Sequence, residues 1–128
     1  MALCVLSVTA AGAAWALEQG VPAPQDTRYP GTIRIAVDAS DTAQGIFRVH
    51  EEIPVRRGDL TLLYPQWIPG NHSPSGPIDM LAGLKVTADG EALPWTRDEY
   101  DVYAFHVQVP AHVRTVTVDF QYLSGRLA

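Results

Sequence analysis

Hydrophobic and polar residues alternate with a period of two along most of the chain, which is typical of β-strands with one buried face. We expect strands over residues 32–39, 45–53, 60–64, 83–88, 92–96, 101–109 and 114–122. No apolar stripe at helical spacing is long enough for three turns, and residues 80–84 leave room for at most one helical turn. The predicted fold class is therefore all-β: an antiparallel β-sandwich or curved sheet of about seven strands.

Short turn signals separate these strands. Asp89-Gly90 is the strongest of them, because a type I′ hairpin turn needs positive φ at both central residues. We also expect a turn at residues 56–59 and a short reversal at residues 110–112. The pattern thus indicates neighbouring antiparallel strands joined by tight connections.

One segment, residues 65–77, interrupts the alternation and reads PQWIPGNHSPSGP. Its four prolines exclude a central strand, since proline cannot donate a hydrogen bond to a neighbouring strand. Loops of this length in compact domains are usually functional or disordered, and Trp67 and Ile68 argue against disorder. Pro69-Gly70 suits a type II turn, where glycine supplies the positive φ. We refer to residues 65–77 as the Pro-rich loop.

The first residues have the pattern of a signal peptide. Residues 1–16 contain no charged side chain and end in Ala14-Trp15-Ala16, a small-x-small cleavage site. Cleavage after Ala16 would remove the single cysteine, Cys4, and would imply a periplasmic or secreted protein. Residues 17–28 read as a flexible, Pro-containing linker before a domain at residues 29–128. The alternative for residues 1–16 is a short buried N-terminal helix.

Composition and net charge exclude several classes of function. The 128 residues suffice for one domain, and 47% of them are hydrophobic. A formal net charge of -5 argues against nucleic-acid binding, because there is no basic excess to neutralise phosphates. One cysteine excludes an intrachain disulfide framework and any site with several thiolate ligands.

No catalytic set emerges from the histidines and serines. His50-Glu51 resembles the start of a zinc helix, but the second histidine would fall at Pro54, which also breaks helices. We expect His50 to be a solvated strand histidine, and the scattered His72, His106 and His112 to be surface residues. Ser73 and Ser75 lie among prolines, without the pattern of a nucleophile elbow.

Several stretches together resemble the N-terminal part of glycyl-aminopeptidase-type zinc metallopeptidases. They are residues 29–33, 46–49, 60–72 and 101–107, and the most specific is Trp67-x-Pro69-Gly70 followed by Gly76-Pro77-Ile78-Asp79. Members of this family are exported gluzincins with an N-terminal β domain, a thermolysin-like catalytic domain and a PDZ domain. The resemblance covers residues 29–124 and implies that this chain is the N-terminal domain.

The resemblance also implies what the chain lacks. The family's zinc motif, HExxH with a downstream glutamate, has no counterpart in this sequence. We therefore expect no catalytic residue, metal ligand or cofactor in this chain, zinc belonging to the family's catalytic domain. The expected partner is that catalytic domain, with peptide substrate contacted indirectly and no membrane partner after cleavage of the leader. The residues expected to border the substrate cleft lie in the Pro-rich loop: Trp67, Pro69, Gly70, Asn71 and His72.

The sequence departs from the family at its end. The family's sheet continues beyond the strand at residues 114–122, so we expect a domain truncated at its C-terminal side, from a fragment or a shortened reading frame. That strand would then be an unpaired, aggregation-prone edge. A stand-alone exported β-sandwich that binds a ligand or partner through the Pro-rich loop is the alternative function.

Overall fold

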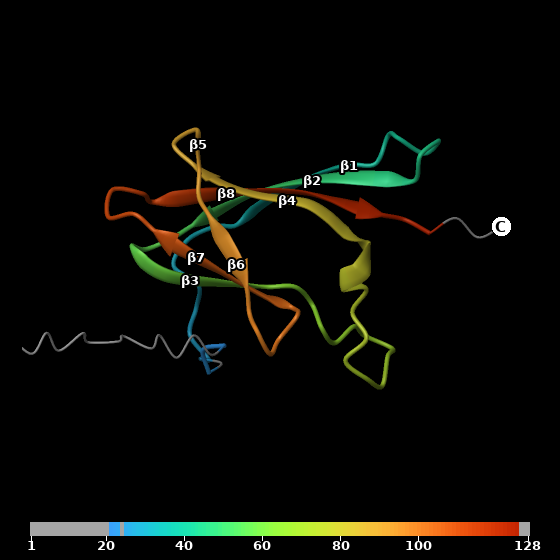
Figure 1. The fold of residues 1–128 in the computed structure, drawn as a ribbon, viewed down its shortest axis with the longest axis horizontal. Helices are drawn as coiled ribbons and strands as arrows, with labels where there is room; N and C mark the ends of the chain where they lie inside the picture. The colour runs from blue at the N-terminus through green and yellow to red at the C-terminus, as the bar shows by residue number, and fades with distance from the viewer. Residues whose placement is uncertain (1–20, 24, 126–128) are drawn as a thin grey trace, which may run out of the picture.

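The computed structural model describes residues 21–23 and 25–125, which contain eight β-strands and one short 3-10 helix (Figure 1). The elements are β1 (Arg34–Asp38), β2 (Ile46–Pro54), β3 (Gly58–Leu63), η1 (Ile78–Met80), β4 (Leu81–Ala88), β5 (Glu91–Ala92), β6 (Trp95–Arg97), β7 (Ala104–Val109) and β8 (Thr115–Leu123). The predicted signal peptide lies outside the described residues. The described part of the predicted linker, residues 21–23 and 25–28, has no regular secondary structure.

The strands form two antiparallel sheets stacked as two layers (Figure 1). The five-stranded sheet has the order β1-β2-β8-β4-β5, and the three-stranded sheet has the order β3-β7-β6. This arrangement confirms the predicted all-β class. Within the described residues, no helix has the length and apolar character needed to span a membrane.

The connection between β5 and β6 departs from the predicted single strand at residues 92–96. Ala92 ends β5 in the five-stranded sheet, whereas Trp95 begins β6 in the three-stranded sheet. Between them, Leu93 still donates its N–H to the Val86 carbonyl at 2.8 Å, and Pro94 has no N–H to continue the pairing. The chain therefore crosses from one layer to the other at Leu93-Pro94.

The hairpin between β4 and β5 matches its sequence signal. Asp89 and Gly90 have φ values of 50° and 84°, so both central residues are in the left-handed region. This confirms the expected type I′ conformation. The single helical turn lies slightly earlier than predicted, at Ile78–Met80, and β4 already begins at Leu81.

The hydrophobic core lies between the sheets where β2 ends and β8 begins. Its buried residues are mostly valines from both sheets and from the β7–β8 connection: Ile53, Val86, Ala88, Val107, Val109, Val113, Val116 and Val118. Trp95 ties the two layers together, because its Nε1 donates to the Leu84 carbonyl of the other sheet at 3.2 Å. The Trp95 ring also meets Phe105 edge-on at 5.5 Å. We call this region the closed end.

Beyond Ile53 and Val118, toward the opposite end, the sandwich is not filled. A hollow of about 540 Å³ separates the sheets there, and its lining is mostly apolar. We call it the open groove; it is lined by Ile33, Val37, Phe47, Val49, Glu51, Ile53, Leu62, Leu63, Tyr64, Pro65, Leu81, Leu84, Phe105, Val118, Phe120 and Tyr122. The groove exists because β2 and β8 have nine residues each, whereas β3 and β7 have six and do not cover their full length.

Two expectations about strand exposure are wrong. The strand at residues 114–122, expected to be an unpaired edge, is the central β8 and is paired on one side with β2 and on the other with β4. The strand at residues 32–39, expected to be half-buried, is β1 at the edge of its sheet, and all five of its residues are exposed. Alternation predicted which side of β1 is apolar, but the opposing sheet does not reach far enough to cover it.

Candidate functional site

The Pro-rich loop begins after β3 and ends before η1. Its two ends, which we call its base, are held together by backbone contacts. Gly76 donates its N–H to the Gln66 carbonyl at 2.9 Å and thereby closes the loop. A Cβ at residue 76 would lie 1.9 Å from the Pro65 carbonyl oxygen, so only glycine allows this approach. The loop is therefore an ordered excursion with its two ends held together.

Two tyrosines outside the loop hold its returning segment. Tyr103, next to β7, donates its hydroxyl to the Gly76 carbonyl at 3.1 Å and lies 3.3 Å from the Pro74 carbonyl. Tyr64, at the end of β3, donates to the Pro77 carbonyl at 3.4 Å. The two tyrosine rings stack with their centroids 6.4 Å apart. The prolines thus supply carbonyl acceptors that tie the loop to the three-stranded sheet.

The tip of the loop turns where the sequence predicted. Asn71 donates its N–H to the Ile68 carbonyl at 3.0 Å, and Gly70 between them has φ of 91°. Positive φ at the third position of such a turn is the reason that glycine is needed at residue 70. The Asn71 side chain reaches across the tip, its Nδ2 lying 3.1 Å from Ser75 Oγ.

The predicted site residues lie together on this tip and face solvent. Trp67 is 61% exposed, and Pro69, Gly70, Asn71 and His72 are also exposed. The structure thus brings the five residues into one exposed turn on a fixed base. Their place at a substrate cleft stays a prediction.

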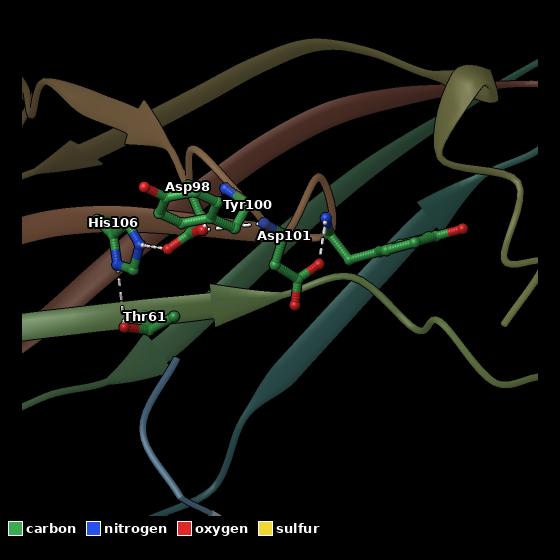
Figure 2. Close-up of polar contacts among 6 residues, drawn as sticks. Thr61, Asp98, Tyr100, Asp101 and His106 are labelled. Atoms are coloured by element: carbon green, nitrogen blue, oxygen red, sulfur yellow. Dashed lines mark hydrogen bonds and ion pairs between the residues drawn. The ribbon is translucent and has the colours of Figure 1, made fainter. Parts of the chain in front are cut away.

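A second polar cluster, which sequence reasoning missed, lies on the three-stranded sheet. His106 on β7 contacts Asp98 and Thr61, which come from either side of it (Figure 2). The His106 Nε2 lies 2.8 Å from Asp98 Oδ2, and its Nδ1 lies 3.2 Å from Thr61 Oγ1. Thr61 is paired with His106 in the β3–β7 register, and Asp98 directly follows β6. One imidazole thus bridges all three strands.

Asp98 also organises the loop that precedes β7. Its Oδ1 accepts the backbone N–H groups of Tyr100 at 2.8 Å and Asp101 at 2.9 Å (Figure 2). Asp101 in turn accepts the N–H of Tyr103 at 2.9 Å. The hydrogen bond from His106, followed by those from the backbone, lowers the pKa of Asp98 from 3.8 to about 2. These turns explain why β7 begins at Ala104 and not at the predicted residue 101.

A carboxylate, an imidazole and a hydroxyl in line resemble a hydrolytic relay, but their burial indicates a structural role. The side chains of His106 and Asp98 are only 12% and 5% exposed, so a substrate has little access to them. The expectation that His106 is a surface residue is therefore wrong. Alternation placed His106 on the outer face of its strand, but only the fold brings Asp98 over it.

The other histidines are more exposed. His50 lies 2.7 Å from Asp119 across the β2–β8 pair and is about half exposed, as a strand histidine in solvent was expected to be. His112 lies 3.8 Å from Asp89, with both side chains mostly exposed. Within residues 21–23 and 25–125, no three His, Cys, Asp or Glu side chains lie close enough to hold a metal ion together.

Comparisons with known proteins agree with this architecture. The model of the peptidase M61 N-terminal domain matches residues 34–127. A crystal structure of an aminopeptidase N family protein from Idiomarina loihiensis has a similar fold, with a TM-score of 0.63 and 22% sequence identity. The similarity covers 76% of this chain but only 16% of that protein, so the chain spans a small part of the length of this structural relative. No curated protein matches the chain.

Proposed function

Since the chain belongs to the peptidase M61 N-terminal domain family, we propose that it is the non-catalytic N-terminal domain of an exported zinc aminopeptidase. In this role it supports the catalytic domain and borders the substrate cleft with its Pro-rich loop. The observation that carries the proposal is the contrast within this loop. Its base is fixed by Gly76 and two tyrosines, whereas its tip presents Trp67 to solvent.

Such a loop is well suited to contact another domain. A pre-ordered loop loses little conformational entropy when it binds, so more of its contact energy is retained. Tryptophan is enriched among the residues that dominate interfaces, because its large ring buries much area with few rotatable bonds. We assign Trp67 to the contact with the catalytic domain, and Asn71 and His72 to the side nearer the substrate.

The test joins this domain to the catalytic domain of an M61 glycyl aminopeptidase and compares loop variants. We expect the double substitution Asn71→Ala and His72→Ala to raise KM about three- to tenfold without changing the melting temperature. The matched control is Tyr100→Ala, which removes an aromatic ring that is 94% exposed on a different loop. Unchanged kinetics in the double variant would remove the cleft role and favour the alternative that Trp67 only caps the open end of the sheet.

The isolated chain tests the non-catalytic part of the proposal. Catalytic zinc needs three protein ligands and an open position. In our proposal this chain supplies no such set of ligands. We therefore expect the purified chain to bind no stoichiometric zinc and to release no product from glycyl or alanyl amides. One tightly held zinc per chain, found by metal analysis after dialysis, would contradict this. Export is tested separately by N-terminal sequencing, which should begin at Leu17.

A further inference from the structure

The open groove contains one charged residue, Glu51, among apolar and aromatic neighbours. On β2 it follows Phe47 and Val49 on the face that points toward the other sheet. In the neighbouring strands its register partners are Ile35 and Val118. No other residue of the groove lining carries a charge. Glu51 therefore places a carboxylate where the pattern of the strand calls for an apolar side chain.

The Glu51 carboxylate has no hydrogen bond or ion pair within the described residues. Its neighbour Glu52, on the opposite face, lies 3.5 Å from Arg34. Partial burial without a partner raises the pKa of Glu51. A carboxylate taken out of water is stabilised when a cation pairs with it. The groove thus offers apolar contact area together with one unmatched negative charge.

We propose that the open groove docks an extended polypeptide segment that is apolar on one side and carries a single lysine or arginine to pair with Glu51. The exposed apolar side chains Ile33, Val37 and Leu63, at 46%, 56% and 60% exposure, supply the surface that such a segment would cover. A hollow of about 540 Å³ has the volume of pockets that hold several side chains.

The strand at the rim of the groove favours a polypeptide as the occupant. β1 lies at the edge of the five-stranded sheet, so one side of its backbone is available for pairing with an added strand. A second copy of this chain is a poorer partner, because each copy has a net charge of -5 and two copies repel each other. This binding does not involve the tip of the Pro-rich loop, so it is independent of the proposed cleft contact.

The experiment uses three labelled peptides of about nine residues with alternating valine and threonine. The central residue on the valine side is lysine, its neutral isostere norleucine, or glutamate. We expect fluorescence anisotropy to show that the chain binds the lysine peptide about fivefold more tightly than the norleucine peptide. Glu51→Gln should abolish this preference, and Glu51→Lys should transfer it to the glutamate peptide.

Two variants serve as controls. Glu52→Gln removes a carboxylate from the opposite face of the same strand and should leave all three affinities unchanged. Trp67→Ala should do the same, which separates this site from the Pro-rich loop. Circular dichroism of each variant establishes that it is folded.

Three results would overturn the proposal. The first is no binding of any of the three peptides up to about 1 mM. The second is an affinity order that does not change when residue 51 becomes glutamine or lysine. The third is a dimer in sedimentation experiments that dissociates when Val37 is replaced by aspartate, since a second copy would then occupy the groove.

Discussion

The two ends of the sandwich are built from the same strands and the same kinds of residue, yet only one of them is closed. At the closed end, Val116 and Val118 of β8 are buried against the valines of β7. Farther along the same face of β8, Phe120 and Tyr122 line the open groove. Val37 on β1 is 56% exposed, although it occupies an inward-facing position like theirs.

The difference shows that alternation and burial are separate properties of a strand. Alternation determines which face of a strand is apolar, because successive side chains point to opposite sides. Burial depends on whether another layer lies over that face. Here the three-stranded sheet ends before β2 and β8 do, so the same pattern gives a core at one end and a groove at the other.

The largest expected effect compares one valine from each end. Val116→Ala removes buried methyl groups from a fully enclosed site, and we expect it to lower the free energy of unfolding by about 2–3 kcal/mol. Val37→Ala should change it by less than about 0.5 kcal/mol, because its side chain is already in contact with water. Urea denaturation of both variants measures the difference. Equal losses would show that the groove is closed in solution.

The next effect concerns the base of the Pro-rich loop beside the open groove. In Gly76→Ala the new Cβ would meet the Pro65 carbonyl, and we expect a loss of about 1–3 kcal/mol in the free energy of unfolding. The matched control is Gly125→Ala, where the nearest atom outside its chain neighbours is Met80 Cε at an ordinary 3.9 Å. A stable Gly76→Ala variant would indicate that the loop base adapts and is not fixed.

Acid titration should separate Asp98 from Glu51, because their pKa values shift in opposite directions. The folded pKa of Asp98 is lowered to about 2 from 3.8, so its ionised form stabilises the fold above pH 3.8. This contribution is lost as the pH falls from 3.8 through about 2. We therefore expect Asp98→Asn to be less stable than the parent protein at neutral pH. As the pH falls toward 2, the difference in stability should shrink, which thermal melts at a series of pH values would measure. Parallel curves for the two proteins would contradict this.

Substitution of Glu51 should have the smallest effect on stability, and the effect at neutral pH should be opposite in sign to that of Asp98→Asn. Burial raises its folded pKa above 4.5, so its stability contribution is greatest when it is protonated and is lost as the pH rises through that raised pKa. We expect the melting temperature of Glu51→Gln to be slightly higher than that of the parent at neutral pH. Below pH 4.5 the two melting temperatures should be the same. Glu52→Gln, which loses the pair with Arg34, is the matched control and should not gain stability at neutral pH.

Local features could be predicted from the sequence, whereas features that depend on distant segments could not. Asp89-Gly90 and Gly70 were predictable because a turn needs positive φ at a given residue, whatever surrounds it. The change of sheet at Leu93-Pro94 was not, because Pro94 indicates that pairing is interrupted but not that the next strand joins the other layer.

The functional candidates divide in the same way. The five residues of the Pro-rich loop tip are close in sequence, so the Pro69-Gly70 pair alone predicted a turn there. His106 and Asp98 form a partly buried pair because the loop before β7 folds back over the sheet, which no spacing rule reveals. For Glu51 a signal was present: it is the charged residue in the inward series Phe47, Val49, Glu51, Ile53.

The position of β8 also determines when the chain can fold during its synthesis. β8 is the last strand of the described residues, yet it pairs with β2 on one side and β4 on the other, and His50 and Asp119 in that pairing are 69 positions apart. Until residues 115–123 have left the ribosome, β2 has no partner toward the centre of its sheet, and the closed end lacks Val116 and Val118. A nascent chain stopped before residue 115 should therefore remain sensitive to protease, and protection should arise in one step when β8 is released.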